Sequence, residues 1–300
     1  MISGIINVYK EKGYTSHDVV AKLRGILHQK KIGHTGTLDP EAEGVLPVCL
    51  GSGTKLCDML TDKSKTYQAV LLLGQNTDTQ DTTGTVLETR EVTVTEEEAE
   101  KCILGFVGEY SQIPPMYSAL KVDGKKLYEL ARAGIEVERK PRQVSIHSIE
   151  IQQISLPEIV MTVSCSKGTY IRTLCYDIGQ KLGCGGCMKS LKRIRVGSFA
   201  VSQSRTLDEI RALQEEQRLP EILVPVDAMF PETLAVHVLP ETEKYLKNGN
   251  PLQPGWFAEE VPRTGQARIR IYDTSDRFCA IYQWNTARKL FIPEKMFLEG

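Results

Sequence analysis

One stretch organises the chain: Gly33-His34-Thr35-Gly36-Thr37-Leu38-Asp39-Pro40-Glu41-Ala42-Glu43-Gly44. Its glycines allow positive φ and the close approach of another segment, and Pro40 pushes the residue before it into extended backbone. Such a run fits neither a helix nor an ordinary strand, so it predicts a stiff loop that presents Asp39. The same composition is also typical of a solvated turn, and the rest of the chain has to decide between the two.

Size and composition indicate a globular protein of two domains, or of one large domain with an appendage. The chain has 300 residues, of which 41% are hydrophobic and 25% charged, as is ordinary for such proteins. It contains no apolar run long enough to span a membrane, and its first residues become polar too early for a secretory signal. Eight cysteines lie scattered, mostly in apolar segments, as in proteins of a reducing compartment. We therefore expect a cytoplasmic protein.

Charge is distributed in blocks. The net charge of −1 argues against a generic nucleic-acid binder. Residues 181–205, however, carry bases and no acid, and residues 118–142 carry more bases than acids. Such blocks predict either a local phosphate-binding surface or solvated basic faces, and charge alone leaves both open.

Hydrophobic periodicity predicts alternating helices and strands. Strands are expected over 3–8, 65–73, 144–153, 158–166 and 191–199, and residues 45–50 are expected to form a buried strand or a short turn. Helices are expected after an N-cap at Ser16, over 54–61, after the capping boxes Thr95–Glu98 and Thr206–Glu209, and near 125–133. Residues 111–142 are a less regular insertion, which is typical of a binding loop. Prolines 220, 225 and 231 predict a boundary before a β-rich part with strand-like runs at 267–272, 278–284 and 289–292.

Arg172 lies where the helix dipole disfavours a cation. Residues 166–172 end one strand and open a helix, with Thr169 as the expected N-cap. A cation in the first turn costs about 0.3–1 kcal/mol, and a residue that breaks a local rule often has a partner elsewhere. A carboxylate is the natural partner of a guanidinium. The alternative is an Arg172 side chain that extends into solvent.

The common catalytic motifs are missing. The chain has no Walker loop, no GxGxxG after a strand, no His-Glu-x-x-His and no Gly-x-Ser-x-Gly. Cys184 and Cys187 lack a second pair or a nearby His that would complete a zinc site, so we expect a structural role for them. What remains is one positioned Asp, a Tyr at the start of a strand, an Arg at the start of a helix, and the basic blocks.

These features together resemble one family. The motifs that carry the resemblance are Gly33 to Pro40, Lys65-x-Tyr67, Thr77-Asp78-Thr79-x-Asp81-x-x-Gly84 and Lys167-Gly168-Thr169-Tyr170-Ile171-Arg172. From residue 4 to about 230 the chain is similar to the TruB family of bacterial tRNA pseudouridine-55 synthases, and residues 236–300 resemble its PUA-like RNA-binding domain. The chain departs from the family at Val8-Tyr9-Lys10-Glu11, where Asp-Lys-Pro is usual, which affects the local turn and not the catalytic residues.

The resemblance implies a fold, a reaction and a partner. The fold is mixed α/β with a largely antiparallel sheet: a catalytic domain over 1–230, with an RNA-binding insertion at 111–142, and a small β-rich PUA-like domain over 231–300. The reaction is the isomerisation of uridine 55 in the T-loop of tRNA, in which the N1–C1′ bond breaks, the uracil turns and C5 bonds to C1′. It is redox-neutral, so no cofactor and no metal are implied. The implied partner is tRNA, through its T-arm stem-loop, with no membrane and no protein partner.

The family's site residues carry over to named positions. Asp39 would be the catalytic carboxylate, either as a nucleophile or as a base in glycal formation, and Arg172 would favour its charged form. Tyr67 would stack on the extruded uracil and could take part in proton transfer. The substrate-binding residues would be His34, which fills the space that the flipped base leaves, Tyr170 and Leu191 as pocket walls, and Asp81, which accepts a hydrogen bond from a base edge. The insertion and the 181–205 block would hold the loop and the phosphates.

Two other functions stay open. A non-catalytic RNA-binding or RNA-folding chaperone on the same fold would bind tRNA without turnover. A nucleoside hydrolase would turn over free uridine. The ordered motifs favour the synthase over both.

Overall fold

A computed structural model describes residues 1–122 and 124–298. Asp123 of the expected insertion and the last two residues of the expected C-terminal domain lie outside the described residues. Within these ranges the chain forms a ten-stranded sheet with the order β14-β1-β3-β12-β4-β11-β10-β7, to which β2 adds at β3 and β13 at β12. The strands are β1 (Gly4–Lys10), β2 (Ile32–His34), β3 (Glu43–Leu50), β4 (Lys65–Leu73), β7 (Gly108–Gln112), β10 (Arg142–Ser155), β11 (Glu158–Cys165), β12 (Gly186–Val196), β13 (Phe199–Ala200) and β14 (Leu223–Val224).

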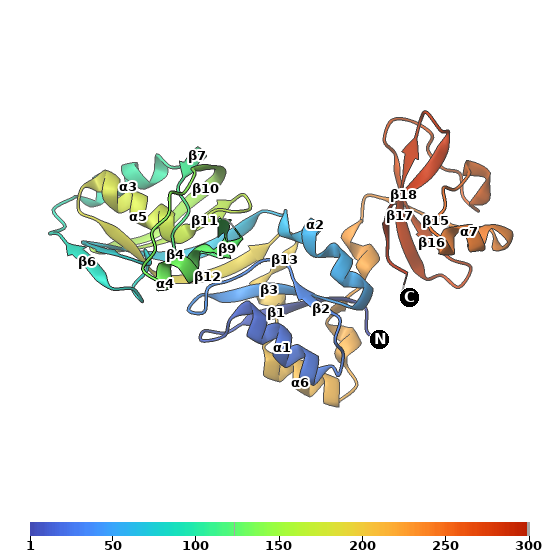
Figure 1. Ribbon diagram of the computed structural model, residues 1–300, viewed down its shortest axis with the longest axis horizontal. Coiled ribbons are helices and arrows are strands. Elements are labelled where there is room, and N and C mark those ends of the chain that lie inside the picture. The colour runs from blue at the N-terminus through green and yellow to red at the C-terminus, as the bar shows by residue number, and fades with distance from the viewer. Residues whose placement is uncertain (123, 299–300) are drawn as a thin grey trace.

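Helices pack on this sheet at two places (Figure 1). α1 (Ser16–Ile26) and α6 (Leu207–Glu215) lie together beside β1, and Leu23 and Ile210 are fully buried there. α3 (Glu96–Leu104) and α5 (Ile171–Leu182) lie together on the half of the sheet that contains β4 and β10. The short helices α2 (Cys57–Thr61) and α4 (Leu127–Arg132) complete the arrangement. The chain therefore has the mixed α/β fold with a largely antiparallel sheet that the resemblance implied.

β4 places Tyr67 on the core face of the sheet. Along this strand buried and half-buried residues alternate, because successive side chains of a strand point to opposite faces. Ala69, Leu71 and Leu73 share the face of Tyr67 and pack with Leu174 of α5. Full burial of each large aliphatic side chain stabilises the fold by about 1.5–3 kcal/mol, so the position of Tyr67 is fixed by the core around it.

The parallel pair in the large sheet lies beside the Gly33–Gly44 stretch. β3 and β12 run parallel, with Arg193 opposite Gly44, whereas the other neighbouring strands are antiparallel. Gly44 has φ +106°, and a Cβ there would lie 2.2 Å from the carbonyl oxygen of Arg193. Only glycine permits this approach. The loop that carries Asp39 therefore ends where β3 meets β12.

Several boundaries differ from the expectations. The Gly33–Gly44 stretch is not wholly a loop, because its ends belong to β2 and β3. The N-cap of α1 is Thr15, since the Ser16 hydroxyl instead accepts a hydrogen bond from the Leu38 N–H. Thr169 does not cap α5, because its hydroxyl donates to the carbonyl of Ser166. β12 begins at Gly186, earlier than expected, and breaks before Gly197, where φ is +54°. The capping boxes at Thr95–Glu98 and Thr206–Glu209 are confirmed.

A second, four-stranded sheet forms a separate body at one end of the molecule (Figure 1). Its order is β15-β16-β17-β18, with β15 (Leu234–His237), β16 (Arg268–Tyr272), β17 (Phe278–Asn285), β18 (Leu290–Met296) and the short helix α7 (Glu243–Lys247). The three strand-like runs are thus confirmed, whereas β15 and α7 were not expected. Phe230, before β15, packs with Phe278 and Phe297 of this body. Two hairpins also occur, β5 (Gln75–Thr77) with β6 (Val86–Thr89), and β8 (Lys121–Val122) with β9 (Lys125–Lys126) in the insertion. No helix in the described ranges is long and apolar enough to cross a membrane.

Candidate active site

Asp39 and Arg172 meet in a two-point ion pair. Arg172 Nε lies 3.0 Å from Asp39 Oδ2, and Nη2 donates to Oδ1 over 3.3 Å. The Arg172 side chain is 6% exposed, whereas that of Asp39 is 40% exposed. The buried guanidinium therefore holds a carboxylate that remains accessible from outside. This confirms the predicted carboxylate partner of Arg172 and excludes an Arg172 that extends into solvent.

The rest of the guanidinium is held by main-chain oxygens and a second acid. Nη2 donates to the carbonyl of Tyr117 over 2.8 Å, and Nη1 donates to the carbonyl of Thr79 over 3.1 Å. Asp81 Oδ2 lies 3.7 Å from Nη1. Because a guanidinium is rigid and planar, these contacts fix its plane and so fix the direction in which it presents Asp39.

The helix that carries Arg172 starts at a fixed point. Tyr170 is the N-cap of α5, and Gln112 at the end of β7 binds its main chain twice. Tyr170 N–H donates to Gln112 Oε1 over 2.8 Å, and Gln112 Nε2 donates to the Tyr170 carbonyl over 3.0 Å. This amide fixes the main chain of the N-cap residue and so sets where Arg172 enters the site.

Although the Asp39 side chain is 40% exposed, the protein atoms packed around it displace water and raise the pKa of its carboxyl group. Burial raises the pKa of Asp39, the Arg172 guanidinium opposes that rise, and the nearby Asp81 adds to it. The net direction is upward. Arg172 favours the charged form, as expected, but the burial that outweighs it was not visible in the sequence.

Tyr67 and Leu191 lie in the hydrophobic cluster beside Asp39. Both side chains are 8% exposed, and Leu38, which precedes Asp39, packs in the same cluster. Burial raises the pKa of Tyr67, and the guanidinium of Arg193 lowers it. The net direction is upward, so the hydroxyl stays protonated at neutral pH.

Tyr170 and His34 are both half-buried. The pKa of Tyr170 is raised by burial and lowered by Ser118 and Arg172, which places its ring near the ion pair. His34 ends β2, and its ring contacts that of His17 edge-on at 5.3 Å. Burial lowers the pKa of His34 to about 4. At neutral pH His34 is therefore an uncharged aromatic ring.

Asp81 is bound mainly by its own loop. Its Oδ1 accepts hydrogen bonds from the Thr79 hydroxyl at 2.8 Å and from the Thr83 N–H at 3.0 Å, and its Oδ2 faces Arg172. The structure thus brings Asp81 to the ion pair as a further anchor of Arg172. Contact of Asp81 with a base edge stays a prediction.

Two buried cations near Asp39 were missed by the sequence interpretation. Lys10 is fully buried, and its ammonium donates to the carbonyls of Pro40 and Ala42 over 3.0 and 2.6 Å. Burial lowers its pKa to about 8. Arg193 is 1% exposed and binds carbonyls at both ends of the same loop. One signal in the sequence could have revealed them. In each strand the cation stands at a position where the alternating pattern calls for a buried apolar side chain, which indicates that the cation itself is buried.

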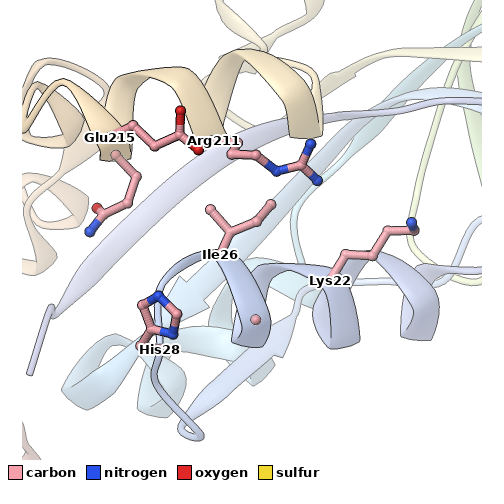
Figure 2. A pocket seen from close by; sticks show the side chains of 7 residues that line it. Lys22, Ile26, His28, Arg211 and Glu215 are labelled. Carbon is pink, nitrogen blue, oxygen red and sulfur yellow. The ribbon is translucent and has the colours of Figure 1, made fainter.

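A groove elsewhere contains none of these residues. It holds about 490 Å³ between α1 and α6 and is lined by Lys22, Gly25, Ile26, His28, Arg211, Gln214 and Glu215. In Figure 2, Lys22 and Ile26 come from one helix and Arg211 and Glu215 from the other. Charges of both signs line it, and Asp39 does not, so this groove is not the candidate active site.

Comparison with known proteins identifies the family of this site. Residues 24–171 match the TruB family pseudouridylate synthase N-terminal domain, and residues 172–231 match the tRNA pseudouridylate synthase B C-terminal domain. The chain belongs to the TruB family. The tRNA pseudouridine synthase B of Lachnoclostridium phytofermentans is 55% identical over 99% of this chain and 100% of that protein. The protein of the same name from Bacillus pumilus is 44% identical over 99% of this chain and 98% of its own length.

Solved structures agree on the fold. The chain resembles one in the crystal structure of a Cbf5-Nop10-Gar1 complex, with a TM-score of 0.71 and 26% identity, covering 98% of this chain and 85% of that one. A chain of the archaeal box H/ACA sRNP Nop10-Cbf5 complex matches with a TM-score of 0.70 and 24% identity, covering 98% and 86%. This TruB-family member therefore has the fold of those chains over nearly its whole length.

Proposed function

We propose that this TruB-family protein is a tRNA pseudouridine synthase that isomerises uridine 55 in the T-loop, with Asp39 as its catalytic carboxylate. The observation that carries the proposal is the Asp39–Arg172 ion pair, in which a buried cation presents an accessible carboxylate beside a tyrosine ring. The family membership and the relatives named tRNA pseudouridine synthase B support the activity and the substrate class.

The chemistry requires an ionised carboxylate at C1′ of the nucleotide. Asp39 acts either by attack on C1′, which forms a C1′–O bond as the N1–C1′ bond breaks, or by removal of the C2′ proton of the ribose, which gives a glycal as the N1–C1′ bond breaks. In the first route C5 of the turned uracil then displaces the Asp39 oxygen from C1′, and in the second C5 bonds to C1′ of the glycal as the proton returns to C2′. In both routes N1 gains a proton and C5 loses one. Arg172 fixes the direction of Asp39, because two-point contact restricts both oxygens. A misplacement of about 1 Å costs on the order of 100-fold in rate.

The neighbouring side chains provide a dry pocket for the base. A base within a folded RNA loop must be extruded at a cost of a few kcal/mol, and aromatic stacking recovers about 1–3 kcal/mol per base. Tyr67 supplies that ring, Leu191 and Tyr170 form the walls, and the uncharged His34 fills the vacated space. The insertion at 111–142 places Tyr117 directly at Arg172, which supports a role for this segment in holding the T-loop.

Mapping of pseudouridine in an unmodified tRNA transcript tests the proposal. Wild-type protein should convert uridine 55 and leave a transcript with cytidine at that position unmodified. Asp39→Asn should bind the transcript without converting it. Conversion of a different uridine would contradict the site assignment, and release of free uracil would indicate a hydrolase.

A further inference from the structure

Arg193 occupies the junction between the two strands that flank the site. It lies on β12, opposite Tyr67 of β4 on one side and opposite Gly44 of β3 on the other. It is 1% exposed and is among the largest fully buried side chains described. A group so deeply buried cannot touch RNA, so any function it has must act through its neighbours.

The guanidinium of Arg193 ties both ends of the loop that carries Asp39. Nε donates to the carbonyl of Val45 over 2.7 Å, on the C-terminal side of Asp39, and Nη2 donates to the carbonyl of Gly36 over 3.2 Å, on its N-terminal side. Nη1 lies 3.4 Å from the carbonyl of Thr37. A single rigid group thus sets the distance between the two ends.

Apart from the restriction that Pro40 places on its backbone, the loop is held largely by other segments. Its internal main-chain hydrogen bond runs from the Ala42 N–H to the Asp39 carbonyl over 3.1 Å. Arg193 forms no ion pair with the residues that the structure describes, although a buried cation is costly without a counter-charge. The cation is therefore retained at a cost in stability, which a purely structural hydrogen-bond donor would not require.

Arg193 is also placed against Tyr67. The two residues are cross-strand partners in β12 and β4, so their side chains leave the same face of the sheet. Each group shifts the pKa of the other, Arg193 lowering that of Tyr67 and Tyr67 raising that of Arg193.

We propose that Arg193 is a positioning residue, which sets the Asp39 loop and the Tyr67 ring in one relative geometry. This inference rests on the proposed function, because its effect is read as a loss of pseudouridine formation. It extends that function by assigning a role to a residue that contacts neither substrate nor the catalytic carboxylate.

Arg193→Gln and Arg193→Lys test the proposal. Gln keeps hydrogen-bond donors without charge, and Lys keeps charge without the fork that reaches three carbonyls. The single-turnover rate at saturating enzyme should fall about 100-fold or more in Gln and at least about 10-fold in Lys. The Kd for tRNA should stay within about twofold of wild type. Thermal melts and circular dichroism identify the folded fraction, by which each rate is corrected.

Asp273→Asn is the matched control. Asp273 is a fully buried charge that follows β16 in the C-terminal sheet, and its carboxylate accepts hydrogen bonds from the main-chain N–H groups of Ser275 and Arg277. Its loss should lower the melting temperature with a single-turnover rate within about threefold of wild type. If Asp273→Asn is as slow as Arg193→Gln at equal folded fraction, loss of any buried charge explains the effect and the proposal fails.

A double-mutant cycle with Tyr67→Phe measures the coupling between Arg193 and Tyr67 in the single-turnover rate, which a loss of stability alone would not change. If Arg193 acts partly through the Tyr67 hydroxyl, Arg193→Gln should cost several-fold less in the Tyr67→Phe background than in wild type. Wild-type rates in a folded Arg193→Lys variant would overturn the proposal. If Gln does not fold, the Lys variant decides the question. Activity of the wild-type protein tests the proposed function separately.

Discussion

Replacement of Arg172 by Lys tests how the site holds its carboxylate. Arg172 makes four contacts of 3.3 Å or less, two to Asp39 and one each to the carbonyls of Thr79 and Tyr117. A lysine ammonium is a single nitrogen and cannot reach acceptors that lie around a planar fork. If it keeps two of the four, the loss at about 1.5 kcal/mol for each bond to a charged group is about 3 kcal/mol. That corresponds to a roughly 100-fold lower rate.

The assay is single-turnover pseudouridine formation with excess enzyme, together with the Kd for tRNA and a thermal melt. Arg218→Lys is the matched control, because Arg218 also binds a carboxylate at two points, that of Glu221, on an exposed surface. Its rate should equal that of wild type. A folded Arg172→Lys protein within threefold of the wild-type rate would refute the argument that the fork orients Asp39.

Four further outcomes follow from the same geometry. Asp39→Asn should abolish turnover with Kd nearly unchanged, because it removes charge but not shape; a single-turnover rate above a tenth of wild type would contradict the assignment. Tyr67→Phe should retain activity and Tyr67→Leu should lose it if the ring only stacks, whereas both should be slow if the hydroxyl transfers a proton; rapid turnover by both would remove Tyr67 from the site. The acid limb of the kcat/KM profile should have an apparent pKa above that of an ordinary Asp, since burial raises the pKa of Asp39. Asp81→Asn should move this apparent pKa to lower pH, since Asp81 adds to that rise. An apparent pKa that stays the same or rises in Asp81→Asn would argue against Asp39 as the titrating group. A chain ended near residue 230 should show a higher KM for whole tRNA with kcat largely preserved, checked by a melt because Phe230 loses its contacts with Phe278 and Phe297; an unchanged KM would mean that residues 231–300 do not bind RNA.

The sequence predicted the two site residues whose local context is unusual. Asp39 before a proline and Arg172 in the first turn of a helix both stand out within a few residues of chain, and the structure joins them. The boundaries failed where two residues competed for one role. Thr15 takes the cap that Ser16 was expected to provide, because the Ser16 hydroxyl binds the Leu38 N–H instead.

Partners that are main-chain carbonyls leave no trace in a sequence. Lys10 and Arg193 bind the loop through carbonyl oxygens of residues about 30 and 150 positions away. Every amino acid supplies a main-chain carbonyl, so the residue types in the loop do not indicate that these hydrogen bonds form. The pKa of Asp39 was unpredictable for a related reason, since it depends on burial that only the packed fold creates.

The Asp39 loop takes its rigidity from cations on three separate elements. Arg172 of α5 binds the carboxylate itself, whereas Lys10 of β1 and Arg193 of β12 bind the main chain on either side of it. Asp39 is in turn a counter-charge for this group, because it raises the pKa of Lys10 against the lowering effect of burial. Asp39→Asn therefore removes an attraction that Lys10 needs as well as the proposed catalytic carboxylate. A lower melting temperature in Asp39→Asn would thus reflect the same electrostatic arrangement that positions this carboxylate.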